Sequence, residues 1–298
     1  MALDQEPRSR PEHHPDRHTE TLRRFNRTYT QRIGVLEESF LGTGRPLAVS
    51  RLLFEIGPDG AGVRELRERL DLDSGYLARL LRRLTDDGLV ELAADPADRR
   101  RRTARLTTAG RRTWRDLDHR SDDLARTLVA PLTPRQRDRL ADALATADLL
   151  VRAATITVRE VSPGDPVARD AAGRYFAELD RRFPRGFDPG APDHSGTFLV
   201  ATSAGQPVAY GGVRGLSAET GEIKRMWVHD DWRGAGLGSR MLRELESLAR
   251  RLGHRRVVLD TNRALTEAVA LYARAGYTEI ERYNDNPYAE AWFEKTLT

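Results

Sequence analysis

A glycine-rich stretch near residue 235 has the residue types that bind a phosphate group. Glycine has no Cβ atom, so successive backbone N–H groups and the N-terminus of a following helix can face a diphosphate. A Rossmann turn is excluded, because its third glycine would fall at Met241 or Ser239, and no P-loop Gly-Lys-Ser/Thr is present. We therefore expect this stretch to bind the diphosphate of another cofactor: Arg233, Gly234, Ala235, Gly236, Leu237, Gly238 and Ser239.

The order of the segments around this loop is informative. A strand is expected to end at Val228, five residues before Arg233, and a second strand is expected over residues 256–261. A Leu-Tyr pair at 271–272 and a Gly-Tyr pair at 276–277 follow. Together with the Arg-x-x-Gly-x-Gly loop, this order resembles the acyl-coenzyme A binding region of the GNAT acetyltransferase superfamily.

The resemblance covers about residues 198–293 and implies an α/β (α+β) GNAT fold with a mixed central sheet in the C-terminal half. It also implies an N-acetyltransferase that uses acetyl-CoA as a substrate, acts on the amine of a small molecule and needs no metal. Relatives often have an asparagine seven residues before the tyrosine, where this chain has Leu265, so we consider Asn262 or Thr266 as its replacement. Further cofactor contacts are expected at the strand end, from Met226, Trp227 and Val228.

The chemistry of acetyl transfer assigns roles to two residues. An ammonium group must lose a proton before its nitrogen can attack a thioester. By resemblance, Glu222 is the candidate base, because it lies eleven residues before Arg233, which is the spacing of the catalytic glutamate in the histone acetyltransferase branch of the superfamily. Strand alternation places Glu222 on the same face as Lys224, Met226 and Val228. By resemblance, the backbone N–H near Val228 stabilises the oxyanion and Tyr272 protonates the departing thiolate. The alternatives are a solvent-facing charge for Glu222 and a core tyrosine for Tyr272.

Two polar segments are candidates for the acceptor wall, with ordinary surface turns as the alternative for both. The first, at residues 181–188, contributes Arg185 and Phe187, and the second, at residues 283–288, contributes Asn284 and Asn286. Arg185 or Arg225 could hold a carboxylate with two parallel hydrogen bonds, which favours an amino acid or a related amine as the acceptor.

Three short helices are expected in the N-terminal half, over residues 47–56, 63–70 and 74–85. In the third, four leucines between residues 77 and 84 follow the spacing of one buried stripe, with Asp73 or Ser74 as the N-cap. The opposite face then presents groups suited to base edges and phosphates: Ser74, Tyr76, Arg79, Arg82 and Arg83.

Two short strands after residue 90 flank a polar tip, which is typical of a β-hairpin wing. The tip contains four consecutive arginines, suited to the minor groove or to phosphates, and binding through them should depend strongly on salt: Arg99, Arg100, Arg101 and Arg102.

The recognition helix, the Gly-Leu-Val after it and the spacing from Asp98 to Leu106-Thr107 resemble the MarR family of winged-helix regulators over roughly residues 20–150. The resemblance implies a mainly α winged helix-turn-helix domain. It also implies a homodimer, built from the first helix and the helices after the wing, that binds a pseudo-palindromic site on double-stranded DNA. The alternative is that the arginines only form a solvated helix face.

The charge distribution agrees with a polyanion partner for the N-terminal half. Residues 1–152 contain 29 arginines and 25 acidic residues, a net charge of +4, whereas residues 153–298 contain 20 basic and 20 acidic residues. Cysteine is absent, which excludes disulfides, thiolate metal sites and a cysteine nucleophile. The first residues are polar and no apolar run is long enough to span a bilayer, so we expect a cytoplasmic protein without a membrane partner.

These patterns predict a disordered tail over residues 1–17, a winged-helix DNA-binding and dimerisation domain over 18–152, and an acetyltransferase domain over 156–298. The leading hypothesis is a bifunctional transcriptional regulator and N-acetyltransferase. One alternative is a regulator whose second domain only senses acetyl-CoA, although the presence of Glu222 and Tyr272 favours an enzyme. Another is an acetyltransferase whose N-terminal half only dimerises, which the arginine-rich wing argues against.

Overall fold

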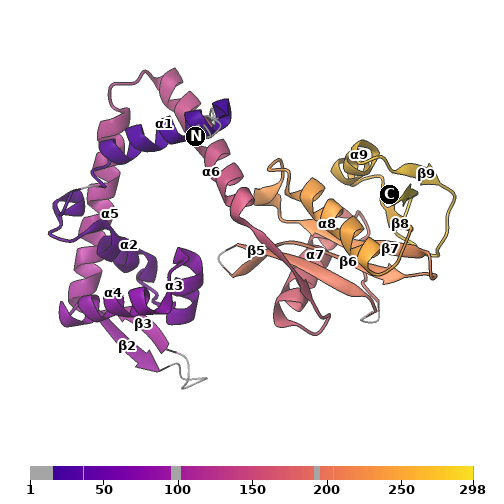
Figure 1. Cartoon of the computed structure of the whole chain (residues 1–298), viewed down its shortest axis with the longest axis horizontal. Helices are drawn as coiled ribbons and strands as arrows, with labels where there is room; N and C mark the ends of the chain where they lie inside the picture. Colours follow the sequence, from indigo (N-terminus) through magenta and orange to yellow (C-terminus); the bar gives the residue numbers. More distant parts are fainter. Residues whose placement is uncertain (1–15, 36, 95–101, 191–194, 204, 298) are drawn as a thin grey trace, which may run out of the picture. The chain divides into compact units, whose positions relative to one another are not determined.

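The computed structural model describes residues 16–35, 37–94, 102–190, 195–203 and 205–297 (Figure 1). Its contacts divide the chain into two compact units, Met1–Arg137 and Asp138–Thr298. The division falls inside helix α6 (Pro134–Thr155), because Leu149 and Ala153 of this helix pack into the core of the second unit. The change from helix to strand comes later, at β4 (Thr157–Val161). The domain limits taken from the sequence therefore stay predictions.

The first unit combines helices with a small antiparallel sheet of strand order β1-β3-β2. Its elements are α1 (Arg17–Arg32), η1 (Phe40–Gly42), α2 (Leu47–Ile56), β1 (Ala61–Gly62), α3 (Val63–Leu70), α4 (Ser74–Asp86), β2 (Val90–Ala94), β3 (Arg102–Leu106) and α5 (Thr108–Val129). The predicted helices and the strands of the wing are thus confirmed. Helix α1 begins at Arg17, so the predicted tail lies almost wholly outside the described residues.

Helix α4 shows why the leucine spacing matters. The Asp73 side chain accepts a hydrogen bond from the backbone N–H of Tyr76 at 2.9 Å and so caps the helix. The four leucines of the stripe are buried in one core with residues of α2, α3 and the wing: Leu77, Leu80, Leu81 and Leu84. Because this face is buried, the opposite face of α4 is left to solvent.

The start of α5 is fixed against the wing through a residue without a side chain. A Cβ atom on Gly110 would lie 2.0 Å from the carbonyl oxygen of Leu89, so only glycine allows this approach. Thr107 caps the helix by accepting from the Gly110 N–H at 3.0 Å, and its hydroxyl donates to the carbonyl of Gly88 at 2.7 Å. The wing and α5 are therefore held as one body.

The second unit is built on a seven-stranded mixed sheet of order β4-β5-β6-β7-β8-β10-β9, in which only the β7–β8 pair is parallel. Its further elements are α7 (Pro166–Arg182), β5 (Thr197–Ser203), β6 (Gln206–Gly215), β7 (Thr220–Val228), η2 (Asp230–Trp232), α8 (Leu237–Arg251), β8 (Arg256–Thr261), α9 (Thr266–Arg274), β9 (Thr278–Ile280) and β10 (Ala291–Thr296). No helix among the described residues has the length and apolar content needed to cross a membrane.

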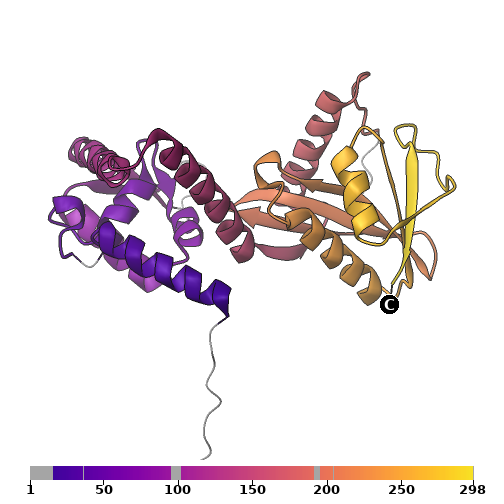
Figure 2. The ribbon, with the colours of Figure 1, turned by 90° about the horizontal axis from the view of Figure 1, so that it is seen from above.

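Helices α7 and α8 cover opposite faces of this sheet (Figure 2). Strand β5 illustrates the two faces, because Leu199 packs into the core beneath α8 whereas Phe198 packs into the core beneath α7. Both faces of the sheet are therefore covered at β5, so we expect an opening for a ligand where neighbouring strands separate.

Strand β7 contains the irregularity that creates such an opening. Its register against β6 shifts near Gly211, and Arg225 adopts a left-handed conformation with φ 56°. The predicted alternation along β7 is wrong beyond this bulge, since Ile223 packs on the α8 side and Trp227 on the α7 side although they lie four residues apart. Moreover, β7 pairs with β8 only as far as Glu222, so the two strands diverge after it.

The close packing of α5 predicts that Gly110→Ala destabilises the first unit. We expect a loss of about 2 kcal/mol in the free energy of unfolding, because the backbone must move to accept the methyl group. Chemical denaturation followed by circular dichroism measures this loss. Gly173→Ala on α7 is the matched control: open space surrounds that Cβ position, so it should stabilise the protein by up to about 1 kcal/mol. Equal effects of the two changes would contradict this packing.

Candidate active site

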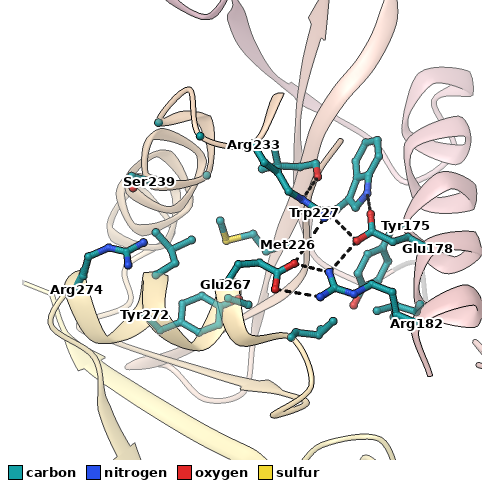
Figure 3. Close-up of a pocket in the computed structure, with 18 residues that line it drawn as sticks. Tyr175, Glu178, Arg182, Met226, Trp227, Arg233, Ser239, Glu267, Tyr272 and Arg274 are labelled. Atoms are coloured by element: carbon teal, nitrogen blue, oxygen red, sulfur yellow. Dashed lines mark hydrogen bonds and ion pairs between the residues drawn. The ribbon is translucent and has the colours of Figure 1, made fainter. Parts of the chain in front are cut away.

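A cavity of about 340 Å³, here called the loop cavity, opens beside the glycine-rich loop (Figure 3). Its walls come from the end of β7, the loop, the start of α8, and helices α7 and α9. Eight of the residues predicted to contact the cofactor line it: Met226, Trp227, Val228, Arg233, Gly234, Gly236, Gly238 and Ser239. Two others do not, because Leu237 is buried in the core and Ala235 packs against it.

The loop can hold a diphosphate through its backbone. Gly234 and Gly236 adopt left-handed conformations with φ of 82° and 77°, which other residue types rarely accept. Gly236 is the N-cap of α8 and provides no side-chain hydrogen bond, so the amides of the first turn keep their capacity to bind an anion. A Cβ atom on Gly238 would lie 3.6 Å from Leu271 and 3.8 Å from Val228, and would narrow the cavity. The residues present therefore fit a diphosphate-containing cofactor.

One wall of the loop cavity is an ion-pair network. Arg233 forms an ion pair with Glu178 and also donates to the carbonyl of Val228 at 3.2 Å (Figure 3). Arg182 bridges two carboxylates: it lies 3.2 Å from Glu178 and also pairs with Glu267. Burial alone would disfavour the charged form of Glu178. However, the hydrogen bonds from Arg233, Trp227 and Arg182 outweigh it and hold the pKa of this carboxyl below its ordinary value. Arg233 is thus a fixed part of the wall.

A second cavity of about 480 Å³, here called the Glu222 cavity, adjoins the first. Six side chains line both cavities: Tyr175, Leu179, Met226, Leu265, Ala268 and Tyr272. Tyr272 is buried, and burial followed by the negative charge of Asp260 raises the pKa of its hydroxyl above the ordinary value. At neutral pH the hydroxyl therefore keeps its proton. Because Tyr272 lines both cavities, it lies where a ligand in one cavity would meet a ligand in the other.

Glu222 is buried in the second cavity and is held by three partners. Arg214 forms an ion pair with it, the hydroxyl of Tyr283 donates to Oε1 at 3.1 Å, and the amide of Asn284 approaches the same oxygen at 3.4 Å. Burial and the Glu222 charge raise the pKa of the Tyr283 hydroxyl, so it remains a donor. The alternative of a solvent-facing charge for Glu222 is wrong.

A second carboxylate, that of Asp260 at the end of β8, lines the same cavity. Its oxygens accept hydrogen bonds from the side-chain amides of Asn284 and Asn286, the latter at 3.1 Å. Burial raises the pKa of Asp260, and the nearby charge of Glu222 raises it further. The hydrogen bonds from the two amides lower it, but by less. Sequence reasoning missed this carboxylate, because Asp260 has no motif of its own.

The predicted acceptor residues do not all converge. Phe187, Arg225, Asn284 and Asn286 line the Glu222 cavity, together with Asn262, which was predicted to contact the cofactor. The Asn262 amide donates to the carbonyl of Tyr288 at 2.8 Å and so supports the acceptor wall. Arg185 is exposed and lines neither cavity.

The predicted DNA-binding residues of the first unit lie on one surface of α4 and on β3. Ser74, Arg79, Arg82, Arg83 and Arg102 are exposed, and Tyr76 is half-buried. The Arg79 guanidinium lies over the Tyr76 ring at 5.4 Å. Arg99, Arg100 and Arg101 lie outside the described residues.

Two family models match the chain. Residues 165–277 match the acetyltransferase (GNAT) family, and residues 43–101 match the MarR family. The chain joins a MarR-family segment to a GNAT-family segment. The match to the GNAT family includes the whole glycine-rich loop and Tyr272, and the match to the MarR family includes all of α4.

Individual relatives resemble parts of the chain. An uncharacterized N-acetyltransferase of Schizosaccharomyces pombe is 38% identical over 66 residues, which is 22% of this chain and 40% of that protein. An IAA acetyltransferase of Azospirillum brasilense is 34% identical over 83 residues, or 28% and 54% of the two chains. This chain thus spans about half or less of these relatives. A putative acyl-CoA N-acyltransferase from Klebsiella pneumoniae is 26% identical, covering 49% of this chain and 99% of its own, with a TM-score of 0.41.

Several residues of the GNAT site could have been found from the pattern of α7. Tyr175, Glu178, Leu179 and Arg182 are spaced i, i+3, i+4 and i+7 and therefore share one helix face, which lines the loop cavity. Which sheet face α7 covers is a tertiary property, so the sequence does not reveal their target. Among the described residues, no three His, Asp or Glu side chains come together as metal ligands.

The ion-pair network predicts a loss of stability in acid. The hydrogen bonds from Arg182 lower the pKa of Glu267 from 4.5 to about 2 against the effect of partial burial, so unfolding releases this carboxyl to take up a proton. The contribution of Glu267 to the free energy of unfolding is fully present above about pH 4.5 and disappears as the pH falls toward about 2. Because the Glu267 side chain is 46% exposed, we expect at most about 1 kcal/mol.

Urea denaturation at pH 6 and pH 3 measures this contribution. Between pH 6 and pH 3, the free energy of unfolding of the wild type should fall by up to about 1 kcal/mol more than that of Glu267→Gln. Glu281→Gln, at an exposed carboxylate away from the cavity, is the control and should lose as much as wild type. An equal acid loss in Glu267→Gln and wild type would show that the network does not stabilise the fold.

Proposed function

We propose that the chain is a transcriptional regulator and an N-acetyltransferase that moves the acetyl group of acetyl-CoA to the amine of a small molecule. The observation that supports this most directly is the shared wall of the two cavities. Met226 and Tyr272 line both, so a thioester entering along the glycine-rich loop can meet an amine entering beside Glu222. The N-acetyltransferase names of relatives of this segment agree with the proposal.

The proposed reaction assigns one proton transfer to each of two side chains. Glu222 removes a proton from the acceptor ammonium, directly or through a water molecule, and the amine nitrogen then bonds to the acetyl carbon. The backbone N–H groups near Val228, a residue that lines the loop cavity, donate to the acetyl oxygen as it becomes negative. As the carbon–sulfur bond breaks, Tyr272 gives its proton to the thiolate, and the second proton that the nitrogen loses restores the tyrosine hydroxyl, directly or through water.

The same proposal gives the MarR segment a role in binding double-stranded DNA. The exposed arginines of α4 contact base edges and phosphates in the major groove, and Arg102 marks the arginine-rich wing. We also propose a homodimer on a pseudo-palindromic site. Its support is α1, which has no buried residue and exposes Leu22, Phe25 and Tyr29. The proposed setting is the cytoplasm, since both DNA and acetyl-CoA are proposed partners.

Two alternatives stay open to experiment. In the first, the GNAT segment only senses acetyl-CoA, and in the second, the MarR segment only dimerises. Glu222 is buried in the Glu222 cavity and Tyr272 is buried in the wall shared by both cavities, and this arrangement supports an enzyme over a sensor. A screen of amines and amino acids for thiol release distinguishes an enzyme from a sensor, because a sensor releases no thiol.

Tyr272→Phe should lower kcat by at least about tenfold, because the departing thiolate loses its proton donor. The affinity for acetyl-CoA, measured by calorimetry, should stay within about twofold, since the ring is kept. Tyr277→Phe is the matched control, because this buried tyrosine lines neither cavity and its change should leave kcat unaltered. An unchanged kcat in Tyr272→Phe would remove this residue from the mechanism.

Arg79→Ala should weaken binding to the DNA upstream of the chain's own gene, because one phosphate contact is lost. The slope of log K against the logarithm of the salt concentration should become about 1 less steep. Titrations at several salt concentrations measure both quantities. Arg126→Ala on α5 is the control: this exposed arginine pairs with Asp122 and Asp123, away from α4. Binding by wild type that does not respond to salt would contradict the proposed role of the MarR segment.

A further inference from the structure

Four aromatic rings form one wall of the Glu222 cavity. Phe187 is central, with ring centroids 5.7 Å from Phe176, 6.0 Å from Phe183 and 4.7 Å from Tyr288. Phe183 and Tyr288 are also stacked, with centroids 5.8 Å apart. All four rings line the cavity and are only half-buried, so part of each remains available to a ligand. A wall of this kind favours a flat apolar group.

The wall is held in place by hydrogen bonds. The Tyr288 hydroxyl accepts from the backbone N–H of Asp188 at 2.9 Å, which ties the end of the loop after α7 to the loop after β9. The backbone N–H of Tyr288 donates to Asn286 at 3.1 Å, and its carbonyl accepts from Asn262 at 2.8 Å. Because these contacts exist without a ligand, little ordering of the wall is needed on binding.

The charges in this cavity single out Asp260. Glu222 forms an ion pair with Arg214, whereas Asp260 accepts hydrogen bonds from the neutral amides of Asn284 and Asn286. The charge of Arg214 also lowers the pKa of Asp260, but less than these two amides do. Each carboxylate oxygen can accept more than one hydrogen bond, so Asp260 retains acceptor capacity toward the cavity.

The other cations of the cavity, Lys224 and Arg225, have contacts of their own. Arg225 lies over Phe176 at 5.3 Å and over Phe198 at 5.8 Å. The cavity therefore combines a carboxylate that retains acceptor capacity with a wall of aromatic rings.

We propose that the acetyl acceptor is a primary arylalkylamine, whose ammonium group binds Asp260 and whose ring packs against Phe183, Phe187 and Tyr288. This inference rests on the proposed acetyl transfer. Asn286 links the two halves of the site, since it donates to Asp260 and accepts from the backbone of Tyr288. The earlier preference for an amino acid relied partly on Arg185, which lines neither cavity.

Calorimetry on the full chain with coenzyme A present tests the acceptor class. We expect 2-phenylethylamine to bind at least about tenfold more tightly than ethylamine, because the phenyl ring is buried against the aromatic wall. Phenylalanine, which adds a carboxylate to the same skeleton, should bind more weakly than 2-phenylethylamine, because its carboxylate would be held close to that of Asp260 when its ammonium group binds there. Phe187→Leu should reduce the affinity for 2-phenylethylamine about fivefold.

Asp260→Asn separates binding of the ammonium from a general effect on the fold. The variant should lose at least about tenfold in affinity for 2-phenylethylamine, because a charge-assisted hydrogen bond is lost. Its affinity for 2-phenylethanol, the neutral analogue with the same ring and chain length, should match that of wild type. Glu279→Gln, which removes a carboxylate that lines neither cavity, should change neither affinity.

The outcomes distinguish this inference from the proposed reaction. If 2-phenylethylamine binds no more tightly than ethylamine or phenylalanine, or if Asp260→Asn has no effect on it, the acceptor class is wrong even where another amine supports thiol release. If the amine binds tightly and in an Asp260-dependent manner without thiol release from acetyl-CoA, the acceptor class stands and the acetyl transfer is wrong.

Discussion

The bulge in β7 is the constraint on which the rest of the second unit depends. By adding one residue near Arg225, it turns Trp227 to the α7 side of the sheet, where the indole N–H donates to Glu178 at 2.8 Å. Glu178 in turn holds Arg233 at the start of the glycine-rich loop. A regular strand would direct Trp227 to the α8 side and break this connection. The bulge thus joins the sheet, α7 and the loop into one site.

The two cavities that meet at Tyr272 differ in the charged groups that line them. The loop cavity contains backbone amides at a helix N-terminus and an arginine network whose charges are balanced by Glu178 and Glu267, which suits an anionic cofactor. The Glu222 cavity is lined by aromatic rings and by the carboxylates of Glu222 and Asp260, of which Glu222 is paired with Arg214, and the ligand that we propose for it is an amine with an apolar part. Each cavity therefore favours a different ligand, and their common wall is the place where the ligands can react.

Local pattern was enough to predict most secondary structure and much of the loop cavity. The leucine stripe of α4 and its Asp73 cap follow from spacing and side-chain chemistry alone, and the structure confirms both. The glycines at 234 and 236 were found because a phosphate-binding loop needs residues without a Cβ atom. The structure adds that both adopt left-handed conformations. The alternation along β7 failed, because a bulge depends on the neighbouring strand and leaves no reliable signal in the strand's own residues.

The sequence by itself determined the order of elements, the division into a MarR-like and a GNAT-like half, and the loop that can hold a diphosphate, because these depend on residues close together in the chain. Only the tertiary structure decided that Asp260, from β8, lies among rings from α7 and the loops after α7 and β9. It also decided that Arg185 stays outside the cavity. These contacts join residues that are distant in the chain, and their positions depend on how helices and strands pack over the whole sheet.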